Sequence, residues 1–297
     1  MQINRHSIKD WVVATRPWSF PASAMPVIVT IAWSFVKAGT VNLWLGLYAL
    51  FTIVMVHASG NLWSDYFDYK KGVDTEATFG SKTLTSGMFK PEEIKAYSIV
   101  ILCFALLLGL GLVLLTGMPV LWIGLAGLVL SLLYPLMKFH ALGDLLIAIC
   151  YAFLPTVGTT YVVTGEIDWG VLWVALPICL ITMAILHVNN VRDIETDSDA
   201  GIITFPMLTG RRFGAALYCF EVLFPYFWIV IICAMGIVPW WCIITFVSLP
   251  ISIKNTKMMM GYKKGIEAYK YLDEKTAQLQ LIFSILLSIG LLIGKMA

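Results

Sequence analysis

Amide and acidic side chains gather in two short stretches that share nearly the same spacing. The six residues are Asn61, Asp65 and Asp68 in the first stretch, and Asn189, Asp193 and Asp197 in the second. Residues three or four positions apart lie on one face of a helix. If both stretches are helical, each therefore presents one amide and two carboxylates together.

Oxygen ligands without a nearby His or Cys suit Mg²⁺, which keeps few protein ligands and commonly bridges to a substrate phosphate. Basic side chains close in the sequence could hold the same phosphates: Lys82, Lys138 and Arg192. The pattern predicts a Mg²⁺–diphosphate site. The alternative is two groups of solvated loop acids, which matched spacing disfavours.

The chain that must position these residues is strongly apolar. It has 297 residues, of which 59% are hydrophobic and 13% charged, and its mean hydropathy is +0.84. A soluble domain carries about 25% charged residues. The composition excludes soluble enzymes, disordered chains and collagen, and the six cysteines all lie in apolar runs. We expect a polytopic membrane protein.

A helix needs about 20 apolar residues to cross the hydrocarbon core. Nine stretches meet this length: 18–37, 41–62, 95–116, 118–136, 142–163, 169–190, 213–236, 237–255 and 276–295. With these spans, all basic residues except Lys37 and Lys295 fall on the N-terminal side, as the positive-inside rule requires. The N-terminus is predicted to be cytoplasmic and the C-terminus outside. Residues 1–18 are polar and show no signal-peptide core.

Both acidic stretches lie at the cytoplasmic ends of predicted spans. A diphosphate clamp above an apolar helical cavity suits a lipid-tailed diphosphate, whose tail would lie among the helices. Electrostatic stabilisation of the leaving diphosphate would let the allylic carbon–oxygen bond ionise. The predicted partners are a lipid-tailed allylic diphosphate, an electron-rich acceptor and the lipid bilayer, with no nucleic acid. Residues 1–297 are expected to form a single all-α domain.

These motifs also carry a family resemblance. The chain resembles the UbiA superfamily of intramembrane prenyltransferases over essentially its whole length. Within it, the chain is most similar to the 1,4-dihydroxy-2-naphthoate polyprenyltransferases of menaquinone synthesis. The supporting stretches are Arg16-Pro17, Asp65-Tyr-Phe-Asp68 through Asp74, Asn189 through Asp197, and Tyr134-Pro-Leu-Met-Lys138.

The resemblance implies nine transmembrane helices around a central apolar cavity, with the active site on the cytoplasmic side. It implies that Asp65, Asp68, Asp193 and Asp197 bind Mg²⁺ and act in catalysis. Substrate-binding roles are implied for Asn61, Asp74, Lys82, Tyr134, Lys138, Asn189 and Arg192. It also implies a polyprenyl diphosphate donor and a small aromatic acceptor, and it suggests an origin in the cytoplasmic membrane of a bacterium.

Some positions depart from the family pattern. Relatives commonly carry basic residues where this chain has Thr83, Ile202, Ile203 and Leu208. The missing cations leave open another acceptor, such as a 4-hydroxybenzoate, a porphyrin or a glycerol-based lipid, or an impaired relative. A transporter is a further alternative, but transporters usually place polar sites at the bilayer midplane.

Three polar residues lie apart from the two motifs. Glu221 lies about two turns into a predicted span, where an acid is usually functional or satisfied by a neighbour. We expect a structural hydrogen bond for Glu221 and a packing role for His187. Asp144 could orient Lys138 or cap its helix.

Overall fold

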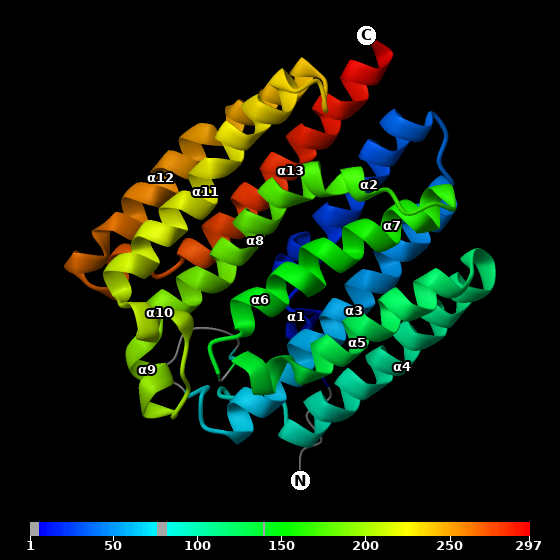
Figure 1. Cartoon of the computed structure of the whole chain (residues 1–297). Helices are drawn as coiled ribbons and strands as arrows, with labels where there is room; N and C mark the ends of the chain where they lie inside the picture. The colour runs from blue at the N-terminus through cyan, green and yellow to red at the C-terminus, as the bar shows by residue number, and fades with distance from the viewer. Residues whose placement is uncertain (1–5, 76–81, 139) are drawn as a thin grey trace.

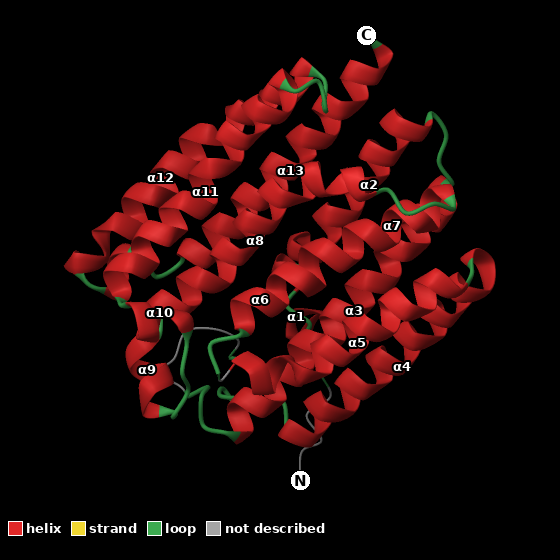
Figure 2. Ribbon diagram, viewed as in Figure 1, coloured by secondary structure: helices red, strands yellow, loops and turns green. Residues whose placement is uncertain are grey.

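The computed structural model describes residues 6–75, 82–138 and 140–297, and its regular structure there is helical (Figure 2). The long helices are α2 (Pro21–Ala38), α3 (Leu43–Lys70), α4 (Pro91–Thr116), α5 (Met118–Lys138), α8 (Leu172–Arg192), α11 (Arg211–Ala234) and α13 (Leu272–Met296). Shorter elements are α1 (Ile8–Ala14), α6 (Gly143–Ile147), α7 (Leu154–Thr164), α9 (Ile194–Asp199), α10 (Phe205–Thr209) and α12 (Leu249–Met260).

The helices pack as two groups joined through the middle of the molecule (Figure 1). One group contains α8, α11, α12 and α13, and the other contains α3, α4, α5 and α7. Helix α2 packs against both α13 and α7 and so connects the two groups. The two acidic stretches belong to different groups, because one lies on α3 and the other follows α8.

In the described residues, seven helical stretches are long and apolar enough to cross a membrane: Pro17–Ala38, Leu43–Lys70, Pro91–Thr116, Gly143–Thr164, Trp169–Arg192, Arg211–Ala234 and Ile266–Met296. The other two predicted spans are not among these seven. Residues 118–136 belong to α5, a helix of 21 residues whose first part, Met118–Tyr134, is apolar. Residues 237–255 divide between a 3₁₀ helix, η4 (Trp240–Ser248), and the first half of α12.

Large apolar side chains cover the outside of the bundle as well as its inside. On α4, Leu107 and Leu114 are 68% and 80% exposed. Such side chains suit contact with lipid, whereas in water they would form aggregation-prone patches. The inner core lies around α8, α11 and α13, where Ile178, Val222 and Phe283 are fully buried.

The long span Gly143–Thr164 is not a uniform α-helix. Between α6 and α7 the chain forms a π-helical segment, η2 (Ala148–Phe153). Single π-helical turns inside α-helices often occur at functional sites. This segment faces a cavity described below.

Candidate active site

The first acidic stretch lies on the last turns of α3, as its spacing predicts. Asp65 and Asp68 are buried, with 3% and 5% of their surfaces exposed. The guanidinium of Arg16 forms an ion pair with Asp65. Ser64 donates a hydrogen bond to Asp68 Oδ2 over 3.2 Å and so helps to orient a motif carboxylate.

Arg16 is placed by the segment between α1 and α2. Its backbone lies in the left-handed region, with φ of +56°, which is uncommon for a residue with a Cβ. Asn61 Nδ2 donates to the carbonyl of Thr15 and to Ser19 Oγ, both at 2.9 Å. The Asn61 amide therefore ties this segment to α3 and holds Arg16 beside Asp65.

The second acidic stretch is built differently, because α8 ends at Arg192 and α9 begins at Ile194. Asp193 lies at the break between the two helices. Arg192 Nε and Nη2 donate to the two oxygens of Asp193, each over 2.8 Å. Arg192 Nη1 also donates to Asp273 Oδ2 over 3.3 Å and to the carbonyl of Lys270 over 3.1 Å. Arg192 thus anchors the second stretch to the start of α13.

The loops after the two stretches share one backbone design. Asp68 accepts a hydrogen bond from Val73 N–H and Asp197 accepts one from Ile202 N–H, both through backbone oxygens at 2.9 Å. Each turn needs a glycine, because Gly72 and Gly201 have φ of +73° and +70°. Val73 and Ile202 belong to one buried apolar cluster. This contact brings the ends of the two acidic stretches together.

The segment after α5 joins the same region. Ala141 N–H donates to the carbonyl of Ile203 over 2.8 Å, and His140 pairs with Ile203 as a short parallel bridge. Tyr134 is half-buried near the end of α5. The side chain of Lys138 lies outside the described residues, so its predicted role is untested. Lys82 is exposed and donates to the carbonyl of Thr75 over 3.2 Å.

Asn189, Asp74 and Asp197 complete the predicted set. Asn189 lies in the last turn of α8, and within the described residues its buried Oδ1 has no hydrogen-bond partner. Asp74 is half-buried, and its N–H donates to the carbonyl of Asp68 over 3.3 Å. Asp197 is buried in α9.

The positions without the family's cations have structural uses here. Ile202 is 4% exposed and packs against Val73, and Ile203 holds the segment after α5 through its carbonyl. Thr83 is buried, and its carbonyl accepts from Phe89 N–H over 3.1 Å. Leu208 is 67% exposed. A lysine in place of Ile202 would lose the contact that joins the two loops.

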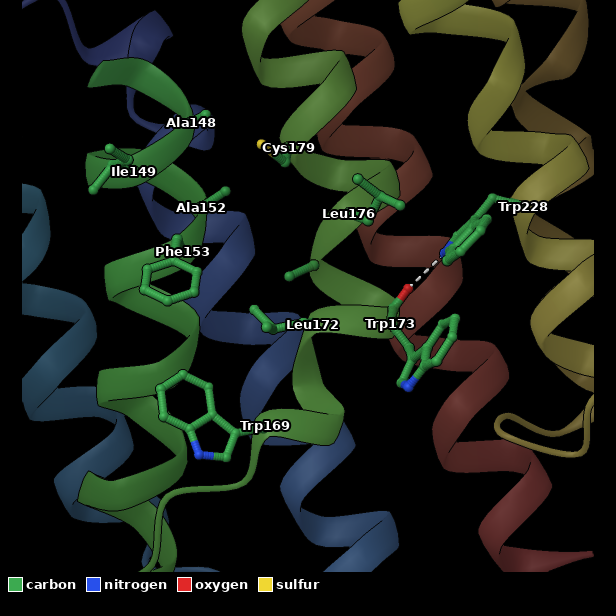
Figure 3. Close-up of a pocket in the computed structure, with 11 residues that line it drawn as sticks. Ala148, Ile149, Ala152, Phe153, Trp169, Leu172, Trp173, Leu176, Cys179 and Trp228 are labelled. Carbon is green, nitrogen blue, oxygen red and sulfur yellow. Dashed lines mark hydrogen bonds between the residues drawn. The ribbon is translucent and has the colours of Figure 1, made fainter. Parts of the chain in front are cut away.

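An apolar cavity of about 640 Å³ lies between η2, α8 and α11 (Figure 3). Ala148, Ala152 and Phe153 line it from η2, and Leu176 and Cys179 from α8. On the third side, Trp228 Nε1 donates to the carbonyl of Trp173 over 2.9 Å, and the two indoles stack. The cavity surface offers an apolar chain or ring almost no polar partner.

The residues of the two stretches suit Mg²⁺ shared with a substrate. Within the described residues, no three His, Cys, Asp or Glu side chains are close enough to hold a metal ion by themselves. Mg²⁺ commonly takes one or two carboxylates and completes its shell with phosphate oxygens and water. Buried carboxylates from two converging stretches fit this second kind of binding.

Sequence reasoning missed two residues of this region. In the sequence, Arg16 is notable only as part of an Arg-Pro pair. Its contact with Asp65 is not predicted, because the two residues are far apart in the sequence. Asp273 lies at the start of α13 and carried no motif signal, yet it contacts Arg192. Both contacts depend on tertiary packing.

Comparison with known proteins identifies the family. The model of the UbiA prenyltransferase family matches residues 24–272. The mouse protein UbiA prenyltransferase domain-containing protein 1 is 30% identical over 298 residues, which covers 98% of this chain and 86% of that protein.

Solved structures show the same fold at low identity. The apo structure of a UbiA homolog from Aeropyrum pernix K1 superposes with a TM-score of 0.68 at 14% identity, over 97% of this chain and 99% of that one. A UbiA homolog from Archaeoglobus fulgidus, bound to DMAPP and Mg²⁺, gives 0.58 at 12% identity, over 94% and 99%. The chain belongs to the UbiA prenyltransferase family and is an integral, multi-pass membrane enzyme that transfers prenyl groups.

Proposed function

We propose that this enzyme transfers a polyprenyl group from polyprenyl diphosphate to an aromatic acceptor, and that the acceptor is 1,4-dihydroxy-2-naphthoate, as in menaquinone synthesis. The observation that carries the proposal is the convergence of two carboxylate stretches through the Val73–Ile202 contact, at one end of a bundle that also holds an apolar cavity. The Archaeoglobus fulgidus relative, which has this fold, binds DMAPP and Mg²⁺.

In this proposal Asp65, Asp68, Asp193 and Asp197 hold Mg²⁺ against the donor diphosphate. Bound Mg²⁺ would neutralise the charge that develops on the leaving diphosphate. Arg16 and Arg192 hold Asp65 and Asp193 in place and lie where they could donate to phosphate oxygens. The further proposed diphosphate contacts are Asp74, Lys82, Tyr134, Lys138 and Asn189, while Asn61 positions Arg16.

The far part of the prenyl chain would lie in the cavity lined by η2 and α8, whose apolar walls suit a hydrocarbon chain. The allylic carbon–oxygen bond breaks and its electron pair leaves with the diphosphate. In the naphthoate reaction that the family resemblance implies, the carboxyl-bearing ring carbon donates an electron pair to the allylic cation and forms the new carbon–carbon bond. The same carbon then loses its carboxyl group as CO₂ and a proton, and the electron pair of the broken bond restores the aromatic ring.

We further propose that residues 1–297 act as one domain with nine membrane crossings and with the site on the cytoplasmic side. The C-terminal end of α13 lies at the opposite end of the bundle from α9, which carries Asp197 (Figure 1). This arrangement supports a C-terminus on the side of the membrane opposite the site. The mouse and archaeal relatives give no support to a bacterial membrane, which stays a prediction from the sequence.

The test is a transfer assay with purified protein, Mg²⁺, labelled polyprenyl diphosphate and separate aromatic acceptors. Dihydroxynaphthoate should yield a prenylated product and free diphosphate. Transfer only to hydroxybenzoate or to another acceptor would contradict the naphthoate assignment alone. An absence of turnover with every acceptor would contradict the proposed activity.

A further inference from the structure

Three ionisable side chains from three helices meet inside the bundle, apart from the two acidic stretches. Glu221 comes from α11, His187 from α8 and Asp144 from α6. His187 Nδ1 lies 3.5 Å from Glu221 Oε1, and their side chains are only 1% and 2% exposed. Asp144 is close enough to interact electrostatically with both. The proposed diphosphate chemistry uses none of the three.

Two carboxylate oxygens of this group are buried and unsatisfied. Within the described residues, Glu221 Oε2 and Asp144 Oδ1 have no hydrogen-bond partner. A buried polar oxygen without a partner is unfavourable, because it has lost its hydrogen bonds to water. His187 Nε2 also has no hydrogen-bond partner among the described residues, but it points toward α11, since a Cβ on Gly214 would lie 3.3 Å from it. The histidine therefore faces protein, and the two carboxylate oxygens are the groups that can accept hydrogen bonds from a ligand.

The group lies between the apolar cavity and the second acidic stretch. His187 precedes Asp193 by six residues on α8, which places it about 9 Å deeper along the helix axis. In the other direction, Met183 and Cys179 follow on the same side of α8 at intervals of four residues. Cys179 lines the cavity (Figure 3). This is the depth at which the first carbons of a prenyl chain would follow a bound diphosphate.

We propose that Glu221 and Asp144 bind the hydroxyl groups of a dihydroxylated aromatic acceptor. Each carboxylate accepts one O–H, and two hydroxyl donors match the two unsatisfied oxygens. A ring with one hydroxyl satisfies only one of them, so the pair selects for two. His187 is a positioning residue, because its contact with Oε1 leaves Oε2 of Glu221 for the ligand. This inference rests on the proposed function and names the chemistry of its acceptor site.

The test measures acceptor binding directly, by anaerobic calorimetry with 1,4-dihydroxy-2-naphthoate and with 1-hydroxy-2-naphthoate. In Glu221→Gln, the amide oxygen can satisfy His187 and leaves an N–H₂ donor facing the ligand. Asp144→Leu removes the carboxylate that would accept a hydrogen bond and replaces it with a side chain of similar size. Each change should raise the Kd of the dihydroxylated ring about tenfold or more, as loss of a charge-assisted hydrogen bond predicts. One of the two should leave the Kd of the monohydroxylated ring unchanged.

Two controls separate this role from a structural one. Glu166→Gln changes an exposed acid between α7 and α8 and should leave both Kd values unchanged. Binding of a non-hydrolysable polyprenyl diphosphate analogue with Mg²⁺ should be equal in wild type, Glu221→Gln and Asp144→Leu. Unchanged acceptor binding in both variants would overturn the inference, as would equal loss of donor and acceptor binding.

The outcome for the proposed function is separate. A wild-type protein that binds the dihydroxylated ring through Glu221 and Asp144 but transfers no prenyl group would refute the proposed function and support this inference. If the wild-type protein transfers prenyl groups, and the wild type and all variants bind both rings equally, the proposed function is supported and this inference is refuted.

Discussion

Val73 packs against Ile202, and each follows the second aspartate of its acidic stretch by five residues. The contact joins two helix groups that are far apart in sequence. Ile202 stands at a position where the family resemblance predicts a cation. The apolar residue therefore contributes to holding the two stretches together, and the carboxylates keep their arrangement without that cation.

We expect Val73→Ala and Ile202→Ala to be coupled. Each removes one side of a shared buried contact, so the double variant should be less destabilised than the two single effects added together. Contacting residues typically show a coupling of about 0.5–3 kcal/mol. Unfolding of the four proteins in detergent measures it. Strictly additive effects would contradict the contact.

Asp197→Asn and Asp199→Asn form a matched pair on α9. Asp197 is buried and belongs to the proposed metal set, whereas Asp199 is exposed. We expect Asp197→Asn to lower kcat about 100-fold or more, the size seen when one electrostatic contact to developing charge is removed. Asp199→Asn should remain near wild type. Similar activities for both variants would refute the assignment of Asp197.

Arg16→Ala should leave Asp65 as a buried carboxylate without its cation. Removing one partner of a buried ion pair costs about 3–5 kcal/mol. Arg16→Lys should retain part of this stability, because it keeps the charge but loses the guanidinium geometry. Lys37→Ala, which changes a basic residue whose Nζ bonds to the carbonyl of Ile237, is the control. Thermal unfolding ranks the variants, and equal melting of Arg16→Ala and Lys37→Ala would contradict the ion pair's role.

The link between Glu195 and Arg211 predicts a pH effect outside the membrane. Arg211 Nη2 donates to Glu195 Oε2 over 2.5 Å, and this hydrogen bond holds the pKa of Glu195 below its ordinary value of 4.5. A depressed folded-state pKa adds stability above the unfolded pKa, and that stability is lost as the pH falls through the folded pKa. Wild type should therefore lose more stability than Glu195→Gln as the pH falls below about 5 and through the lowered pKa of Glu195. Parallel melting curves at all pH values would refute the prediction.

Chelation tests the proposed metal. EDTA should abolish prenyl transfer, and added Mg²⁺ should restore it, because the carboxylates alone cannot neutralise a leaving diphosphate. The Mg²⁺ concentration that gives half of the restored rate should fall as the donor concentration rises, since the Mg²⁺ shell is completed by phosphate oxygens. Full turnover in EDTA would contradict metal dependence.

The sequence predicts the helical membrane architecture and the helical placement of Asp65 and Asp68, because apolar run length and side-chain spacing are local properties. It does not predict the break between two helices at Asp193. At this break Arg192 forms ion pairs with Asp193 and with Asp273, and the second of these depends on tertiary packing. The position of Arg16 beside Asp65 is not predicted either. It depends on a left-handed backbone conformation at Arg16 and on hydrogen bonds from Asn61 to residues next to it. The packing role of Ile202 depends on contact between two loops that are distant in the sequence, so local sequence patterns do not predict it.

The two acidic stretches differ in how their carboxylates are connected. Asp65 and Asp68 share one unbroken helix of 28 residues, whereas Asp193 and Asp197 are separated by a helix end, and Asp197 lies on a helix of six residues. Short elements can open by themselves, while residues inside a long packed helix exchange only when much of that helix unfolds. Amide hydrogen exchange should therefore be faster in α9 than in the last turns of α3. Any adjustment of the enzyme to donors of different size is then expected at the second stretch, around a first stretch that stays fixed.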